Sequence, residues 1–160
     1  MNLPSALLWG LVATMVFTTL MSLSVGFGWS RISLPLVLGA ALSGDRQRAN
    51  VLGFLAQMLV GFAFAVVYVL SFESWRRTGW LLGAGMGIVH GLFVLAVVMP
   101  LLPSFHPRMA GEDYGPNPTR QLEPPGFLAL NYGRNTPLVT LAAHALFGAI
   151  LGGFYTLAGN

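Results

Sequence analysis

Charge is scarce in this sequence: only 8% of its 160 residues are charged, whereas 55% are hydrophobic. A soluble domain carries roughly 25% charged residues, so a soluble fold of this chain would lack the polar side chains to cover its surface. We therefore expect lipid to surround much of the protein. The eight basic residues are all arginines. They form no basic face with interleaved aromatic residues, so nucleic acid is not an expected partner.

Cysteine is absent, which excludes disulfides, thiolate metal sites and a cysteine nucleophile. The sequence also lacks the GxSxG, HExxH and Walker-type glycine motifs that mark common catalytic sites. Glu112 and Asp113 are adjacent carboxylates in a proline-rich segment, and carboxylates in such a loop are usually solvated. We therefore expect a protein that is not an enzyme.

Long hydrophobic runs account for most of the chain. Four stretches, at about residues 5–28, 51–72, 80–102 and 137–158, provide the roughly 20 apolar residues that a helix needs to cross a membrane. The sequence thus predicts an all-α integral membrane bundle of four transmembrane helices, forming a single transmembrane domain over residues 1–160. Residues 103–136, with six prolines, form one long loop. The apolar stretch 32–42 is too short to span, and we expect it to extend the first helix or to lie in the membrane interface.

The second and fourth stretches share a pattern at fixed spacing. The second contains Gln57-x3-Gly61-x6-Tyr68, and the fourth contains His144-x3-Gly148 followed after six residues by Tyr155. Two similar helical hairpins, each crossing the membrane twice, would form a parallel repeat, and transporters often place a site where their repeats meet. The alternative is coincidence among small apolar residues.

Small and polar residues recur every fourth position in each predicted span. Residues four apart share a helix face, and membrane helices associate through close backbone contact and interhelical hydrogen bonds. These stripes therefore predict a tight bundle, although the same residues would also suit a seam between copies of the chain. The stripes are Gly10, Thr14, Thr18, Ser22 and Gly26; Gly53, Gln57, Gly61 and Ala65; Gly79, Gly83, Gly87 and Gly91; and Thr140, His144, Gly148 and Gly152.

Polar side chains within the spans are the candidate functional residues, because they are costly in lipid. At a rise of 1.5 Å per residue, His90 lies about 15 Å into its span, so it meets His144 near the midplane if their helices are neighbours. Three interpretations are open: hydrogen bonds that hold the bundle, a polar path for protons or solutes, or a histidine pair that binds haem or a metal. The candidates are Gln57, His90, His144, Thr14, Thr18 and Ser22.

His106 and Arg108 follow the third span and form a second candidate site. Together they could bind an anionic group such as a lipid headgroup. The alternative is that both are solvated loop residues.

Three short motifs in the second half of the chain resemble uncharacterised families of small bacterial membrane proteins. They are the His144–Gly148–Tyr155 pattern, Met99-Pro100 with His106-Pro107, and Asn131-Tyr132-Gly133 before Thr136-Pro137. The resemblance is to four-helix inner-membrane proteins, including the YagU-like group. It implies a multi-pass protein of the bacterial inner membrane with no assigned activity, and it carries over no catalytic residue.

The leading functional expectation is a protein that acts through helix association, either as an accessory subunit of a larger membrane complex or as a homo-oligomer, with the lipid bilayer around it and no cofactor. A small transporter or channel with a path through Gln57, His90 and His144 is the alternative from another class. A haem- or metal-binding membrane subunit is a weaker alternative, for which the sequence leaves the metal unspecified.

Arginine distribution predicts the orientation in the membrane. The two larger loops carry six of the eight arginines, and the short loop between the second and third spans carries Arg76 and Arg77. Because cytoplasmic loops are enriched in arginine, we expect both termini outside the cytoplasm. A reporter that is active only in the cytoplasm should be silent at the C-terminus and active within residues 103–136. Activity of the C-terminal fusion would reverse this orientation.

Overall fold

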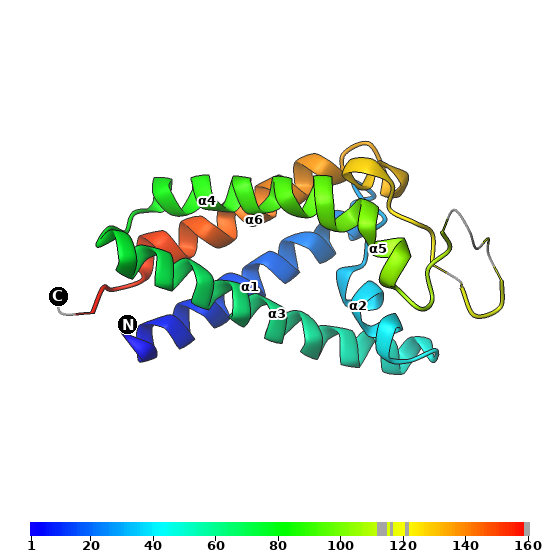
Figure 1. Ribbon diagram of the computed structural model, residues 1–160, viewed down its shortest axis with the longest axis horizontal. Coiled ribbons are helices and arrows are strands. Elements are labelled where there is room, and N and C mark those ends of the chain that lie inside the picture. The colour runs from blue at the N-terminus through cyan, green and yellow to red at the C-terminus, as the bar shows by residue number, and fades with distance from the viewer. Residues whose placement is uncertain (112–114, 116, 121, 159–160) are drawn as a thin grey trace.

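The protein is described here from a computed structural model covering residues 1–111, 115, 117–120 and 122–158; Glu112 and Asp113 lie outside the described residues. The prediction of an all-α fold is confirmed, since these residues form helices and no strand. Four helices are long and apolar enough to cross a membrane (Figure 1). Length and composition thus make this a multi-pass membrane protein.

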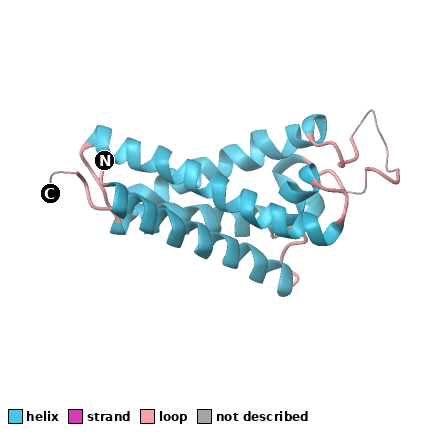
Figure 2. Cartoon of the chain, turned by 90° about the horizontal axis from the view of Figure 1, so that it is seen from below, coloured by secondary structure: helices cyan, strands magenta, loops and turns pink. Residues whose placement is uncertain are grey.

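The helices follow the order α1 (Leu3–Gly26), α2 (Leu34–Leu42), α3 (Arg46–Trp75), α4 (Trp80–Phe93), α5 (Met99–Phe105) and α6 (Thr136–Phe154). A π-helical segment, η1 (Val94–Val98), joins α4 to α5, so that Trp80–Phe105 is one continuous span of 26 residues. A short 3₁₀ segment, η2 (Phe127–Tyr132), precedes α6. Figure 2 shows loops gathered at the two ends of the bundle.

Two helix ends differ from the hydrophobic boundaries. Helix α3 begins at Arg46 because the Asp45 side chain caps it, accepting a hydrogen bond of 2.8 Å from the Arg48 backbone N–H. Residues 46–50 are therefore helical, although most of them are polar. Helix α6 ends at Phe154, and Tyr155 is already extended. Hydropathy finds the part of a helix that suits lipid, whereas capping decides where the helix begins and ends.

The apolar stretch 32–42 does not extend the first helix. It forms α2, a separate helix of nine residues that packs against α3. The two backbones touch at Gly39 and Gly53: a Cβ atom added at Gly39 would lie 1.7 Å from the Ala49 carbonyl oxygen, and one at Gly53 would lie 1.6 Å from that of Pro35. Neither position has room for a side chain, so these two glycines allow the chain to fold back here.

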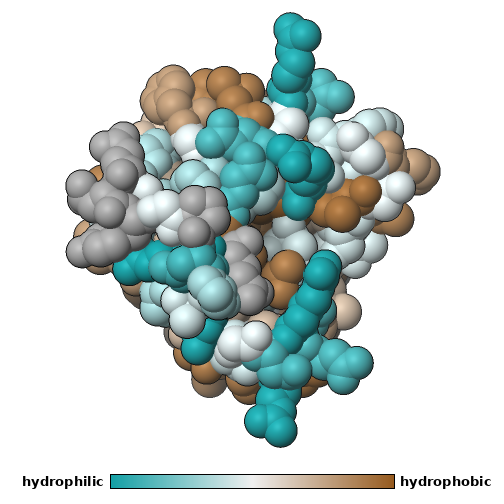
Figure 3. Space-filling model, turned by 90° about the vertical axis from the view of Figure 1, so that its right-hand side faces the viewer, coloured by the Kyte–Doolittle hydropathy of each residue, from teal (hydrophilic) through white to brown (hydrophobic). Residues whose placement is uncertain are grey.

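The four long helices form an open arrangement in the order α4, α6, α1, α3. Helix α6 packs against α4 and α1, and α1 packs against α3, whereas α3 and α4 are not a major packed pair. Both termini lie at one end of the bundle (Figure 1). Figure 3 views the opposite end, where hydrophilic side chains gather and hydrophobic ones lie around much of the edge. The outward helix faces are strongly apolar; Leu59, Val89 and Leu138 are 72%, 68% and 71% exposed.

The glycine stripes lie inside the bundle and bring α4 against α6. A Cβ atom at Gly83 would lie 2.0 Å from the Gly148 carbonyl oxygen, and one at Gly87 would lie 2.1 Å from that of His144. At the end of the contact, the Gly79 N–H donates a 2.7 Å hydrogen bond to the carbonyl of Gly152. Of the two uses expected for these stripes, the structure shows the one within a single chain.

The first hairpin, formed by α1 and α3, has the same contact register as the second, formed by α4 and α6. Gly10 lies against Ala65 and Thr14 lies against Gly61. In both hairpins, a step of four residues along one helix is matched by a step of four back along its partner. The pairs Gly61–Thr14 and Gly148–Gly83 occupy corresponding places in the repeated pattern. This common register supports the interpretation of the chain as two related hairpins.

The α1 stripe departs from expectation in its second half. Gly10, Thr14 and Thr18 are buried, but Ser22 is exposed, and Met21 and Ser24 are buried instead. With 3.6 residues per turn, each step of four rotates about 40° beyond a full turn. Three such steps carry Ser22 roughly 120° away from Gly10, which takes it out of the face that α1 packs against α3 and α6.

The glycine contact generates a test with a built-in control. Gly87→Ala should destabilise the protein by at least about 1–3 kcal/mol, because the added methyl group overlaps the α6 backbone and the helices must separate. Gly85 has no atom within 4 Å of an added Cβ, so Gly85→Ala should be neutral or slightly stabilising. Thermal unfolding of both variants in mild detergent measures the difference. Equal stability of the two variants would contradict the α4–α6 packing.

Candidate functional site

The two intramembrane histidines meet in the centre of the bundle. The ring centroids of His90 on α4 and His144 on α6 lie 4.7 Å apart, with the rings nearly perpendicular at 81°. The glycine contact explains this proximity, since a Cβ atom at Gly91 would lie only 3.2 Å from the Cβ atom of His144. The ring of Phe17 packs edge-on against His144 at 4.9 Å, and Phe64 lies against His90 at 4.1 Å.

A cavity of about 230 Å³ lies beside this pair. It is bounded by α1, α2, α3, α4, η1, α5 and α6, and its walls are mostly apolar. Five of its lining residues are polar: Thr14, Gln57, His90, Thr140 and His144. The structure thus brings together four of the six intramembrane residues singled out in the sequence and adds Thr140, which had been noted only as part of the α6 stripe.

The histidines use only part of their hydrogen-bonding capacity. His144 Nδ1 donates to the Thr140 carbonyl at 2.8 Å, which assigns the proton to Nδ1 and leaves Nε2 of the neutral ring as an acceptor. His90 Nδ1 lies 3.3 Å from the Tyr68 hydroxyl. With the phenol as the donor in this contact, the proton of a neutral His90 ring is on Nε2. That nitrogen is buried and has no partner among the described residues.

The third polar group of the cavity is the amide of Gln57. The residue is only 7% exposed, yet no hydrogen bond joins its side chain to another described residue. In a non-aqueous environment, an amide without a partner costs free energy. Gln57, His90 and His144 therefore all line this cavity with part of their hydrogen-bonding capacity unused.

The remaining intramembrane candidates do not extend this region into a path. The hydroxyls of Thr14 and Thr18 donate back to the carbonyls of Gly10 and Thr14 at 2.7 Å and 2.8 Å, a common arrangement in helices. Thr18 does not line the cavity, and Ser22 is exposed on the outside of α1. Toward the termini the interior is filled by apolar side chains, namely Val69, Phe72, Phe147 and Leu151.

The π-helical segment η1 forms one wall of the cavity through Val94 and Val98. Its hydrogen bonding reaches one residue further than in an α-helix, as the Met99 N–H donates to the Val94 carbonyl. Pro100 follows at once and has no N–H to donate, so it interrupts the ordinary α-helical ladder. π-Helical turns occur frequently at functional sites, and this one adjoins the helical turn that carries His90.

His106 is not a solvated loop residue, and both His106 and Arg108 bond to backbone carbonyls of α2. His106 is buried, and its Nε2 donates to the Val37 carbonyl at 2.9 Å, while its Nδ1 accepts from the Arg108 backbone N–H. The Arg108 guanidinium donates to the carbonyls of Ala40 and Ala41 at 2.6 Å and 3.4 Å. These carbonyls end α2, so Arg108 places a cation where the helix dipole is negative.

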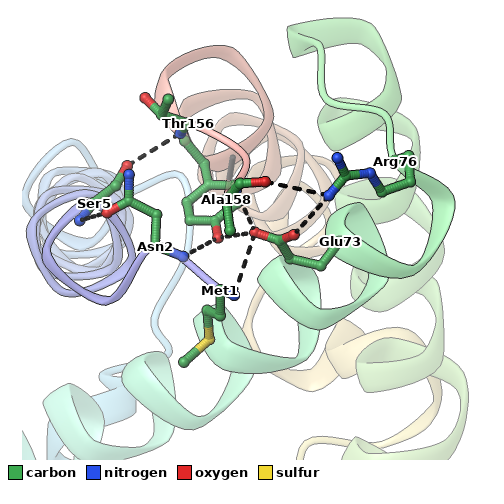
Figure 4. Close-up of polar contacts among 8 residues, drawn as sticks. Met1, Asn2, Ser5, Glu73, Arg76, Thr156 and Ala158 are labelled. Carbon is green, nitrogen blue, oxygen red and sulfur yellow. Dashed lines mark hydrogen bonds and ion pairs between the residues drawn. The ribbon is translucent and has the colours of Figure 1, made fainter. Parts of the chain in front are cut away.

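The structure also reveals a polar cluster that the sequence did not predict, at the end of the bundle that carries the termini (Figure 4). Glu73 lies in the last turn of α3, and its Oε1 accepts hydrogen bonds from the Tyr155 hydroxyl at 2.6 Å and the Ala158 N–H at 2.9 Å. The α-amino nitrogen of Met1 lies 3.7 Å from the same oxygen. Burial, followed by the hydrogen bond to Glu73, raises the pKa of Tyr155. The one sequence feature that involved this cluster was Tyr155, the second tyrosine of the repeated pattern.

The histidine geometry bears on the metal hypothesis. Two axial imidazoles that bind one metal through bonds of about 2.0 Å have ring centroids roughly 6 Å apart. The 4.7 Å separation and perpendicular rings of His90 and His144 are too close for that arrangement. Among the described residues, no group of three His, Cys, Asp or Glu side chains is placed to hold a metal ion.

No family model, curated protein or solved structure matches this chain. The function must therefore be argued from the site itself. Its chemistry is that of a small apolar cavity lined by Gln57, His90 and His144, each of which has polar atoms without a hydrogen-bond partner among the described residues, beside two helices that do not pack closely together.

Arg108 provides a test of the α2 cap. Arg108→Ala should lower the stability by about 1–2 kcal/mol, because two carbonyls at the end of α2 lose a charged donor. Arg134→Ala, at an exposed arginine of the same end, should have little effect. Unfolding would be measured in nanodiscs with and without anionic lipid. A loss confined to anionic membranes would instead support headgroup binding by Arg108.

Proposed function

We propose that this chain is a membrane protein that binds one small, lipid-soluble molecule in the cavity beside His90 and His144, without chemical conversion. The observation that carries the proposal is an apolar cavity of about 230 Å³ bordered by the Gln57 amide and by His144, whose Nε2, like that amide, has no hydrogen-bond partner among the described residues. Ligand sites are typically apolar concavities with a few convergent polar groups. A ligand that bonds to these groups would remove the cost of leaving them unsatisfied.

The small-residue stripes give little support to association between copies of the chain. Those stripes are occupied by contacts within the chain, and a seam between copies would have to separate α4 from α6. A role as an accessory subunit would use the outward apolar faces, which lipid covers equally well. A transporter or channel would need a continuous polar path, whereas the interior beyond the cavity is filled by the side chains of Val69, Phe72 and Leu151.

We further propose the bacterial inner membrane as the location, in multi-pass form. The resemblance to YagU-like proteins supports this location. The arginine distribution supports a cytoplasmic position for the loop end that carries six arginines. The orientation and the ligand hypothesis are independent, since neither rests on the other's observations.

The test compares ligand occupancy in two variants of η1. Val94 lines the cavity, whereas Val97 is exposed on the same segment. Native mass spectrometry of protein purified in mild detergent, and of protein incubated with total membrane lipid extract, should detect one small molecule bound to the wild type. Val94→Phe should lose it because the added ring fills the cavity, and Val97→Phe should retain it.

The outcomes separate the candidate functions. A wild-type protein that binds no small molecule in either sample contradicts the proposal, as does full occupancy of Val94→Phe. A second protein in the purified peak would favour the accessory-subunit hypothesis. A visible absorbance band that requires His90 and His144 would favour the cofactor hypothesis.

A further inference from the structure

A groove runs along the outside of the bundle between α3 and α4. It has a volume of about 680 Å³, and its lining is mostly apolar, with exposed side chains that include Val67, Leu81 and Val89. Phe64 borders both this groove and the cavity, and its ring packs on His90 with the two centroids 4.1 Å apart. These two rings separate the spaces, so the groove is a site of its own on the lipid-facing side of the bundle.

The repeat shows that this groove replaces a helix contact. If the two hairpins are superposed, α1 matches α4 and α3 matches α6, so the α1–α6 pair corresponds to the α3–α4 pair. The first pair is packed, and the rings of Trp9 and Phe154 stack across it with centroids 4.5 Å apart. The second pair is not closely packed. Lipid tails are as apolar as these side chains, so a hydrocarbon chain suits the space that the helices leave.

The dimensions of the groove match one leaflet of a membrane. Its α3 wall extends from Phe64 to Trp75, and its α4 wall extends from Leu81 to Phe93. At 1.5 Å per residue these walls are roughly 16–18 Å long, about half of the 30 Å hydrocarbon core. Over that length, the volume of about 680 Å³ corresponds to a cross-section of about 40 Å², half that of a helix roughly 10 Å across. The groove is therefore too narrow for a further transmembrane helix.

The turn that joins α3 to α4 lies at the surface end of the groove, at the end of the bundle that carries both termini (Figure 1). It comprises residues 76–79 and begins with two arginines. The Arg76 guanidinium donates to the Ala158 carbonyl at 3.2 Å and lies 3.8 Å from the Glu73 carboxylate (Figure 4). The Arg77 side chain is exposed, and its guanidinium has no partner among the described residues.

Arg77 is placed where lipid headgroups lie. Its backbone N–H donates to the Phe72 carbonyl at 3.2 Å, which fixes it directly after the end of α3. Trp75 and Trp80 flank the turn and are 52% and 62% exposed, and tryptophan is enriched at the membrane–water interface. A basic residue at this depth attracts the anionic headgroups of lipids. The turn thus supplies a free cation at the open end of an apolar groove.

We propose that the α3–α4 groove binds an anionic phospholipid, with the phosphate group at Arg77 and one acyl chain in the groove. The chain extends from Trp75 at the membrane surface toward Phe93 near the midplane. The partner is a lipid of the leaflet at the end of the bundle that carries the termini. This site is separate from the cavity, so the inference does not rest on the proposed function.

The first experiment separates the headgroup from the chains. The full chain, purified in mild detergent, would be titrated with dioleoylphosphatidylglycerol, with dioleoylglycerol and with inorganic phosphate, and bound species would be counted by native mass spectrometry. The phospholipid should bind at least about five-fold more tightly than dioleoylglycerol, because only the phospholipid offers an anionic group to Arg77. Inorganic phosphate should not bind, since it has no chain to place in the groove.

The second experiment tests the arginine. Arg77→Ala should weaken phosphatidylglycerol binding about five-fold, and Arg77→Lys should retain most of it, because the attraction is largely one of charge. Arg134→Ala is the matched control. It removes an exposed arginine at the opposite end of the bundle and changes the net charge by the same amount, so it should leave binding unchanged.

The third experiment fills the groove. Gly85 lines it and has no atom within 4 Å of an added Cβ, so Gly85→Phe places a ring there without disturbing the α4–α6 contact. This variant should lose phosphatidylglycerol, and so should Val89→Trp on the same wall. Ile88 is 45% exposed on α4 but does not line the groove, so Ile88→Phe should retain the lipid. Val94→Phe, which fills the cavity, should retain it as well.

Several outcomes would overturn the inference. Equal binding of the phospholipid and dioleoylglycerol would show that the headgroup is not recognised. Equal weakening by Arg77→Ala and Arg134→Ala would reduce the effect to overall charge. Full binding by both groove-filling variants would place the chain elsewhere. If Val94→Phe alone loses the phospholipid, the lipid occupies the cavity, and the separate site fails while the proposed function stands.

Discussion

The backbone contact between α4 and α6 is the constraint on which the rest of the site depends. Lipid offers no hydrophobic drive for helices to associate, so close packing and polar contacts must hold them together. Gly83 lies against Gly148 and Gly87 against the His144 carbonyl, with no space for a side chain at either glycine. This proximity brings His90 beside His144. A bulkier residue in the stripe would separate both the helices and the imidazoles.

The same close packing has an opposite consequence on the other side of the bundle. Helix α4 is drawn to α6, and α3 is drawn to α1 and α2, so α3 and α4 are left without a tight contact between them. The cavity and the groove lie along this open side. Polar groups that would normally pair across a helix interface, such as the Gln57 amide, face the resulting space. The site is thus a product of where the small residues are and where they are absent.

Polar interactions at the two ends of the bundle fix the positions of the helices relative to the segments that flank them. Arg108 and His106 tie the start of the long loop to α2, which itself packs against α3. At the opposite end, Glu73 joins α3 to Tyr155 and Ala158 in the segment that follows α6. Charged hydrogen bonds are stronger than neutral ones and depend on geometry. They connect elements that the apolar surfaces alone would leave free to slide.

Sequence alone determined the four spanning helices, because the length and polarity of a span are set by the bilayer. It also indicated the buried stripes on α3, α4 and α6 and the possible meeting of His90 with His144, since helix geometry fixes which residues share a face. Only the tertiary structure decided that α2 folds back onto α3, that Ser22 faces outward and that His106 is buried against α2. It also decided that Glu73 binds the C-terminal segment. These outcomes depend on contacts between distant segments, which local hydropathy and spacing do not specify.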